Sequence, residues 1–235
     1  MVIFFDIDDT LISHSSAMRA ATIALHQNAN LSITLEAFLE TWHDAHRRYY
    51  PRFLSGELTY AATTRARARE AIDPSLSDKE ADDLFGGYLA AYEAGWSVLP
   101  DVLPCLDRLT SVRLGVISNG RADEQRRKLV STEIYDRFEY ILISEDCGRA
   151  KPNPEIFRLA CDAICVSPTE AVYIGDHYEL DACGARNAGL CGVWLDRRGV
   201  ASQDHQGPMI RSLGELFQLA EVQPPNIRME PTRPS

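Results

Sequence analysis

Four polar segments of the chain, each following a short apolar run, carry residue types that could do chemistry. They are Asp6-Ile7-Asp8-Asp9-Thr10, Ser118-Asn119-Gly120, Lys151-Pro152-Asn153-Pro154, and Gly175-Asp176 with Asp181 five residues later. Carboxylates brought together without a counter-ion repel one another, and Mg²⁺ offsets this because it prefers oxygen ligands. Apart from His177 and Cys147, no His or Cys competes in these segments, which argues against zinc or copper. We therefore expect Asp6, Asp8 and Asp176 to share a Mg²⁺ site.

The apolar runs before these segments are the strands that would position them. Val2–Phe5 is continuously apolar, which is typical of a strand buried on both faces of a parallel sheet. Further strands are predicted at 113–118, 140–144, 171–175 and 191–195, with helices between them at 122–130, 154–164 and 178–188. This alternation indicates an α/β fold with a doubly wound parallel sheet. Ligands bind such sheets beyond the carboxyl ends of the strands, so the four polar segments should meet there.

Residues 15–96 have a different pattern. Four helices are predicted, at 16–27, 34–54, 59–72 and 77–95, with no convincing strand among them. Ser77 and Glu80 form a capping box, which marks the start of the fourth helix. We predict an all-helical module at 15–96 inserted into a core of residues 1–14 and 97–222. A last helix is expected at 213–220, and residues 223–235, with four prolines, read as a flexible tail.

Taken in order, the motifs DIDDT, S-N-G, K-P-x-P-x-x-F and G-D-x-x-x-x-D resemble the four signature motifs of the haloacid dehalogenase (HAD) superfamily. The resemblance covers about residues 2–195, and the helical module is similar to the C1-type cap of the phosphatase branch. Each motif alone has modest specificity, but four in order, each after a predicted strand, make a strong joint signal. The resemblance implies a Rossmann-like core, a Mg²⁺ cofactor and hydrolysis of a phosphomonoester through an aspartyl-phosphate.

The resemblance also implies roles for the acidic residues. Asp6 matches the nucleophile, and Asp8 matches the general acid that protonates the leaving alcohol and then activates water. Asp6, the backbone carbonyl of Asp8, and Asp176 match the metal set. Dehalogenases of the superfamily lack an acid at the position of Asp8, because a halide leaves without a proton. The presence of Asp8 therefore favours phosphoester chemistry.

Five further residues are expected around the phosphoryl group. Ser118 and the backbone N–H of Asn119 would bind its oxygens, and Thr10 would donate a hydrogen bond to the site. Lys151 would hold the phosphoryl charge and keep Asp6 ionised. Asp181 is expected behind the metal ligands, where it would orient metal-bound waters or the lysine.

Other residues near these motifs have less defined roles. His177 stands where this branch often has a small hydroxyl residue; it either bonds a metal-bound water or, as we favour, faces solvent. Asp9 matches no catalytic role and is interpreted as a loop carboxylate. His43 and His46 lie three residues apart without a partner motif, and we expect both on the surface.

The helical module contains a cluster of arginines. Between Asp44 and Ile72 the chain has Arg47, Arg48, Arg52, Arg65, Arg67 and Arg69 against three acids, with four aromatic residues interleaved. In one interpretation an arginine anchors a second anionic group of the substrate and an aromatic side chain stacks on a ring. In the other, which we favour, the cluster is an ordinary exposed helix face. A nucleotide or another small phosphorylated metabolite, such as a sugar phosphate, is the candidate substrate.

Composition excludes several classes of function. The 235 residues include 24 Lys and Arg against 34 Asp and Glu, a net charge of -10, which is unsuited to nucleic-acid binding. The sequence has no apolar stretch near the length of a membrane span and no signal-peptide pattern. Six scattered cysteines without a C-x-x-C motif suit a reducing compartment, so a cytoplasmic location is expected. The expected oligomeric state is a monomer or a homodimer. Two alternatives remain open: a phosphosugar mutase, and a catalytically idle binding protein that retains the fold.

Overall fold

Six parallel strands form one sheet in the computed structural model, which describes residues 1–201 and 205–219. In spatial order they are β3 (Tyr140–Ile143), β2 (Arg113–Ser118), β1 (Val2–Phe5), β4 (Ala171–Gly175), β5 (Cys191–Leu195) and β6 (Met209–Ile210). The predicted parallel α/β sheet is confirmed. The strand order reverses between β1 and β4, and ligands bind at such a reversal in open parallel sheets.

Strand β1 shows why its sequence is apolar without alternation. Ile3 and Phe5 face a core completed by helices α5 (Val102–Arg108) and α6 (Ala122–Ser131). Val2 and Phe4 face the opposite core, completed by α8 (Pro154–Ala163) and α9 (Gly184–Ala188). All four side chains are fully buried, and burial of each one stabilises the fold by about 1.5–3 kcal/mol.

Several elements of the core differ from the sequence prediction. The predicted helix at 178–188 is instead a π-helix, η3 (Tyr178–Cys183), followed by α9. The expected helix at 213–220 is a 3₁₀-helix over Leu213–Gln218, and both residue 220 and the predicted tail lie outside the described residues. Strand β6 and the short helices α5 and α7 (Ser144–Cys147) were not predicted. Short 3₁₀-helices cover Tyr135–Arg137 and Pro168–Glu170.

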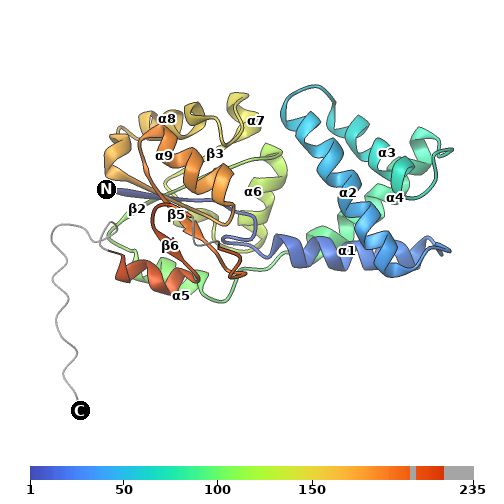
Figure 1. The fold of residues 1–235 in the computed structure, drawn as a ribbon, viewed down its shortest axis with the longest axis horizontal. Helices are drawn as coiled ribbons and strands as arrows, with labels where there is room; N and C mark the ends of the chain where they lie inside the picture. Colours follow the sequence, from blue (N-terminus) through green and yellow to red (C-terminus); the bar gives the residue numbers. More distant parts are fainter. Residues whose placement is uncertain (202–204, 220–235) are drawn as a thin grey trace, which may run out of the picture.

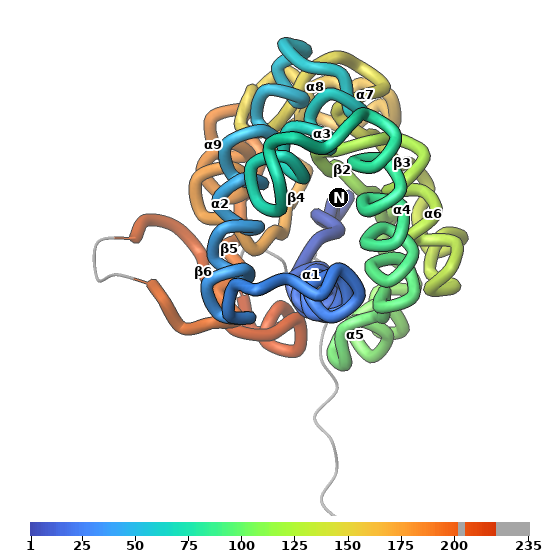
Figure 2. The backbone as a smooth tube through the Cα atoms, turned by 90° about the vertical axis from the view of Figure 1, so that its right-hand side faces the viewer, coloured from blue at the N-terminus to red at the C-terminus, as the bar shows by residue number. Residues whose placement is uncertain are grey.

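The four helices α1 (His14–Asn28), α2 (Leu35–Leu54), α3 (Tyr60–Ala71) and α4 (Asp78–Ala94) lie together at one end of the sheet (Figures 1 and 2). Their starts follow the sequence: Thr34 and Thr59 cap α2 and α3, and Ser77 forms the predicted capping box with Glu80. They pack around a core of their own, which includes Phe38, Trp42, Ala71, Phe85, Tyr88 and Tyr92. Each helix begins and ends within two residues of its predicted bounds.

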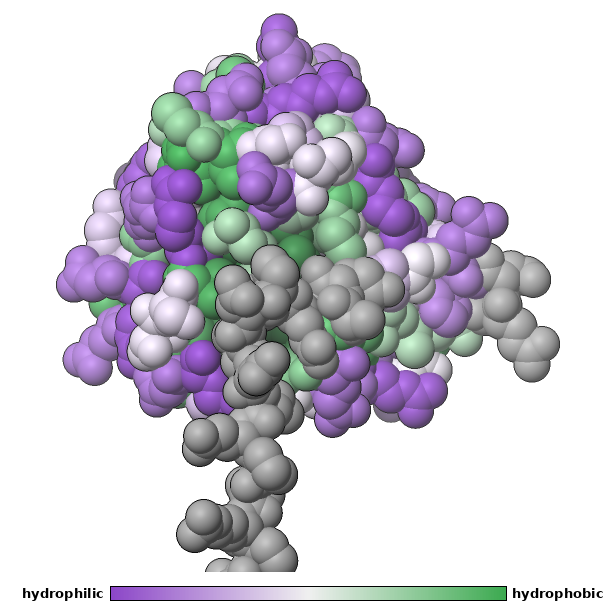
Figure 3. Space-filling model, turned by 90° about the vertical axis from the view of Figure 1, so that its left-hand side faces the viewer, coloured by the Kyte–Doolittle hydropathy of each residue, from purple (hydrophilic) through white to green (hydrophobic). Residues whose placement is uncertain are grey.

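The chain crosses between the sheet and this helical module twice. The two crossings lie side by side, because Ser13 N–H donates to Ser97 O and Leu99 N–H donates to Leu11 O, both at 2.9 Å. The N-terminus lies at the far end of the sheet, so the carboxyl ends of the strands point toward α1–α4 (Figure 1). The face turned away from the module mixes apolar surface with polar side chains (Figure 3). None of the described helices combines the length and apolar character needed to cross a membrane.

Candidate active site

The four predicted polar segments meet in one cavity between the sheet and the helical module. The cavity has a volume of about 400 Å³ and is lined by Asp6, Asp8, Ser118, Lys151 and Asp176, among others. Asp6 continues β1, since its N–H donates to Ile174 O at 2.9 Å. Ser118 ends β2, and Asp176 follows β4. Parallel strands thus bring together residues up to 170 positions apart in the sequence.

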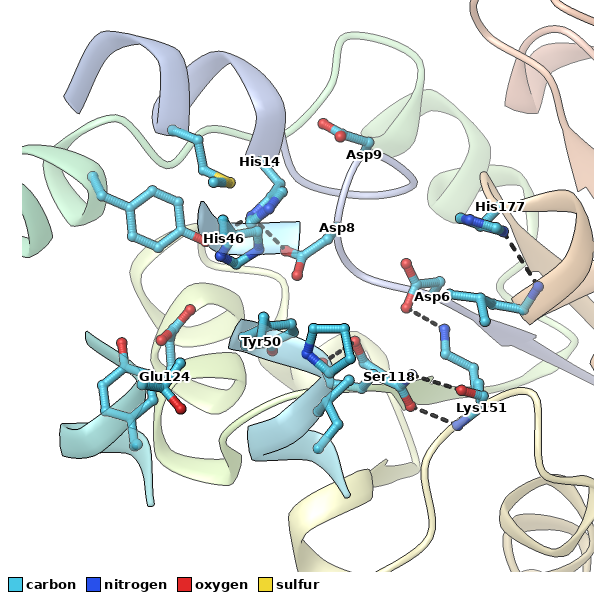
Figure 4. Close-up of a pocket in the computed structure, with 18 of the residues that line it drawn as sticks. Asp6, Asp8, Asp9, His14, His46, Tyr50, Ser118, Glu124, Lys151 and His177 are labelled. Carbon is cyan, nitrogen blue, oxygen red and sulfur yellow. Dashed lines mark hydrogen bonds and ion pairs between the residues drawn. The ribbon is translucent and has the colours of Figure 1, made fainter. Parts of the chain in front are cut away.

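Lys151 is the positive group beside Asp6 (Figure 4). Its Nζ lies 2.7 Å from Asp6 Oδ1, 2.6 Å from Asp181 Oδ1 and 2.7 Å from the hydroxyl of Tyr173. Burial by itself would lower the pKa of Lys151, but Asp181 and Asp6 raise it above its usual value. The lysine is therefore held as a cation beside Asp6.

The loop that carries Lys151 is held by the segment after β2. Asn119 Oδ1 accepts from Lys151 N at 2.7 Å, and Asn119 Nδ2 donates to Lys151 O at 3.0 Å. The side chain of Asn119 thus positions the lysine, a contact that the motif did not predict. Ser118 Oγ is buried and accepts from Gln125 Nε2 at 3.1 Å.

Asp8 is surrounded by groups that the sequence analysis missed. Lys128 Nζ lies 2.7 Å from Asp8 Oδ1, Gln125 Nε2 donates to Oδ2 at 3.0 Å, and His14 Nδ1 lies 3.5 Å from Oδ1. Burial opposes ionisation of Asp8, but His14 and Lys128 hold its pKa well below the usual range. Lys128 itself is 1% exposed. A lysine in an amphipathic helix ordinarily faces solvent, so only its inward position reveals its role.

Three carboxylates could hold a metal ion. Ligand oxygens of Asp6, Asp176 and Asp181 all lie within 4.8 Å of one another. Burial, followed in size by the effects of Asp6 and Asp181, raises the pKa of Asp176 to about 8. Burial likewise raises the pKa of Asp6 to about 6, although Lys151 opposes the shift. This excess of buried negative charge and the all-oxygen donor set fit Mg²⁺.

Asp181 is already occupied by protein donors. It accepts from Lys151 Nζ and from His177 N at 2.9 Å, and its side chain is 2% exposed. Gly175 makes this position possible, since a Cβ on Gly175 would lie 2.3 Å from Asp181 Cγ. These contacts agree with the predicted place behind the metal ligands, and that role stays a prediction.

Two residues of the first motif differ in their relation to the cavity, because Thr10 lies outside it whereas Asp9 lines it and binds Ser15. Thr10 is fully buried, is not among the cavity-lining residues, and its Oγ1 has no hydrogen-bond partner among the described residues. Asp9 has φ +55° and its Oδ1 accepts from Ser15 N at 2.8 Å. Asp9 is therefore a loop carboxylate, as expected. The ring of His177 is exposed and accepts from Leu180 N at 3.3 Å.

The helical module supplies the opposite wall of the cavity. His46 and Tyr50 of α2 line it with stacked rings, 4.8 Å between centroids (Figure 4). The expectation that His46 lies on the surface was wrong, since its half-buried ring lines the cavity and stacks on Tyr50; His43 is exposed as expected. Arg67 of α3 also lines the cavity and is 4% exposed, so the exposed-face interpretation is wrong for this arginine. The other five arginines of the cluster pair with acids outside the cavity.

The arrangement of the site and the fold agree with a match to a known family. The sequence model of the haloacid dehalogenase-like hydrolase family matches residues 1–189. The chain belongs to this family. The match confirms the family predicted from the four motifs, and it covers both the helical module and all four polar segments.

Relatives of this HAD hydrolase indicate the type of reaction that it catalyses. Glyceraldehyde 3-phosphate phosphatase from Methanopyrus kandleri is 32% identical over 84% of this chain and 84% of its own length. Phosphoserine phosphatase from Thermus thermophilus is 28% identical, covering 92% and 96%. The structure of the HAD-hydrolase YfnB from Bacillus subtilis shares the fold, with a TM-score of 0.76 at 23% identity over 92% of this chain and 96% of that one. The family match and these relatives identify the chain as a phosphatase.

Proposed function

We propose that the chain is a Mg²⁺-dependent phosphomonoesterase that acts through an aspartyl-phosphate on Asp6. The observation that carries the proposal is the convergence of Asp6, Asp8, Lys151 and Asp176, from three separate segments, on one cavity. A nucleophile beside a fixed cation, with a second carboxylate two residues on, is what transfer of a phosphoryl group to a carboxylate requires.

In the first step an Asp6 oxygen forms a bond to phosphorus while the bond from phosphorus to the ester oxygen breaks. Asp8 gives its proton to that oxygen, which leaves as the alcohol. In the second step water attacks phosphorus, Asp8 takes a proton from the water, and the bond between phosphorus and Asp6 breaks. Lys151 and the donors at Ser118 and the Asn119 N–H stabilise the phosphoryl oxygens in both steps.

Asp6, Asp176 and the backbone carbonyl of Asp8 would hold the Mg²⁺. When bound, the ion offsets the charge of the phosphoryl oxygens and of the carboxylates. Lys128 favours ionised Asp8, the form needed in the second step. A bound phosphate ester brings negative charge beside Asp8, which favours the protonated form needed in the first step.

We propose that residues 15–96 act as a cap that closes the cavity over a small phosphorylated metabolite. Three observations support a small substrate: the cavity volume of about 400 Å³, its aromatic wall, and the small phosphate esters named for the relatives. A volume in this range holds a ligand of metabolite size. The presence of Asp8 indicates phosphate esters rather than halogenated acids as substrates, because an alcohol leaving group needs a proton and a halide does not.

The test measures hydrolysis of an aryl phosphate and an alkyl phosphate with Mg²⁺ or with EDTA. The native protein should hydrolyse both with Mg²⁺ and neither with EDTA. Asp6→Asn should lower kcat by about 10³-fold or more for both esters. Asp8→Asn should lower kcat/KM, which reports the first step, by about 10²- to 10⁴-fold with the alkyl ester and by much less with a nitrophenyl ester, whose leaving group needs little protonation.

Asp107→Asn is the matched control. Asp107 is exposed and pairs with Arg137 on the surface, so this variant should keep native activity. Undiminished turnover by Asp6→Asn would contradict the proposed nucleophile. An equal loss of kcat/KM with both esters in Asp8→Asn would contradict the proposed proton donor.

A further inference from the structure

Arg67 is a buried cation without a carboxylate. It is 4% exposed, and among the described residues it forms no ion pair and its Nη2 has no hydrogen-bond partner. The neighbouring Arg65 and Arg69 on the same helix both pair with acids of α4. Because a buried charge without a counter-ion is costly, an anion bound in the cavity would stabilise Arg67.

The guanidinium is held in one orientation by the cap. Arg67 Nε donates to Trp42 O at 3.2 Å, and its Cζ lies 4.1 Å from the ring centroid of Trp42 and 5.1 Å from that of Tyr88. Stacking on aromatic rings restrains the arginine, and Nη2 is left without a hydrogen-bond partner among the described residues. The fixed guanidinium is thus ready to bind a planar or tetrahedral oxyanion.

Thr63 adds a second donor one helical turn earlier. It is 5% exposed, and its Oγ1 also lacks a hydrogen-bond partner among the residues that the structure describes. Residues four apart share a helix face, and Thr63 and Arg67 both line the cavity that contains Asp6 and Lys151. Two unsatisfied buried donors therefore lie on one face of α3, at the cavity wall opposite the nucleophile.

His46 does not supply charge at this wall. Burial, followed in size by Arg67, lowers its pKa well below the usual value, so the ring is neutral near pH 7. The acidic groups that line the cavity, such as Asp6, Asp8 and Asp176, come from the core. The cavity is consequently bipolar, with carboxylates at the sheet and one guanidinium in the cap.

We propose that Arg67 and Thr63 form a second oxyanion subsite, which binds a carboxylate or a second phosphate at the end of the substrate remote from the reacting phosphate. This inference rests on the proposed phosphatase function and narrows its substrate class to phosphate esters with a second anionic group. An arginine fork binds such groups with two parallel hydrogen bonds. A phosphate ester without a second anionic group leaves the donors of Arg67 and Thr63 unpaired and should be a poorer substrate.

The test compares matched esters with Mg²⁺ in the full-length protein. One series is ω-carboxyalkyl phosphates of two, three and four carbons, the second is alkanediol bisphosphates, and the third is simple alkyl phosphates of equal length. The native enzyme should prefer one anionic series at one chain length. Arg67→Gln should lower the ratio of kcat/KM for esters with a second anionic group over simple alkyl phosphates by about 10- to 100-fold, mainly through KM. This ratio does not depend on how much of a preparation is folded.

Three variants make the result specific. Arg65→Gln, two residues away but ion-paired with Asp82 on the surface, should leave the ratio unchanged. Arg67→Lys keeps the charge without the fork and should restore part of the preference. Thr63→Val should lower the ratio several-fold, as expected for loss of one hydrogen bond.

Preference for the carboxylate or for the bisphosphate series identifies which oxyanion the subsite takes. No preference in the native enzyme, or an unchanged ratio in Arg67→Gln, would overturn the subsite while leaving the phosphatase proposal intact. An equal fall in activity toward all three series would show that Arg67 only supports cap packing. If the native enzyme hydrolysed none of the esters, the proposed function itself would fail.

Discussion

Replacing Asp176 by Asn should stabilise the metal-free protein while removing its activity. The pKa of Asp176 is raised from 3.8 to about 8 by burial and by the charges of Asp6 and Asp181. An acid whose pKa is raised in the folded state lowers the free energy of unfolding only when it is ionised in the unfolded chain, so this destabilisation is absent below pH 3.8. It grows as the pH rises from 3.8 to about 8, because the unfolded chain ionises more readily.

The size of this effect follows from the pKa. At pH 7 the interval of about 3 pH units above 3.8 corresponds to about 4 kcal/mol, since each unit is worth about 1.4 kcal/mol. Relaxation and residual hydration reduce this figure, so we expect Asp176→Asn to gain about 2–4 kcal/mol. For a chain of this size that gain raises Tm by roughly 5–15 °C.

The assay is thermal unfolding of both proteins from pH 4 to pH 8 with EDTA, and again with Mg²⁺. With EDTA, the Tm of Asp176→Asn should exceed that of the native protein at pH 7 and converge with it near pH 4. Added Mg²⁺ should raise the native Tm and have little effect on the variant. Asp83→Asn, an exposed control, should change stability by no more than about 0.5 kcal/mol. Equal stability of Asp176→Asn and the native protein at pH 7 would refute the reasoning.

Two other predictions concern close contacts in the core. Gly175→Ala would place a Cβ 2.3 Å from Asp181 Cγ. Gly175→Ala should therefore lower the free energy of unfolding by about 1–3 kcal/mol and lower kcat by about 10²-fold, because it misplaces Asp181, which binds Lys151. Gly86→Ala, with open space around it, should have neither effect. A kcat within twofold of native for Gly175→Ala would contradict this prediction. Burial works against ionisation of Asp101, but the Arg197 hydrogen bond lowers its pKa, so its contribution to stability is present above its usual pKa and lost as the pH falls through the folded value. Asp101→Asn should thus lower the unfolding free energy by about 1–2 kcal/mol at pH 7 and by less near pH 3; a difference independent of pH, measured by urea unfolding, would count against the ion pair.

The positions of the main strands and cap helices could be predicted because local pattern and burial agree there. Strand β1 is apolar at every position because both faces of the sheet are covered there. Ser77 and Glu80 mark the start of α4 because their side chains form a hydrogen-bonded capping box. Strand β6 has only two residues, so it leaves no pattern to detect. The predicted helix at 178–188 is divided into a π-helix and α9, and Asp181 in the first part accepts a hydrogen bond from His177 N, a contact across the chain turn that periodicity does not predict.

The sequence by itself determined which residues carry the family chemistry: the order and spacing of Asp6, Asp8, Lys151 and Asp176 were sufficient to identify the family. Only the tertiary structure decided which groups surround them. Lys128 and Arg67 look like ordinary helix-surface cations in the sequence, yet both are buried, one against Asp8 and one in the cap wall. The physical reason is that a motif records positions close in sequence, whereas the electrostatic environment of a site is set by side chains from distant helices that packing turns inward.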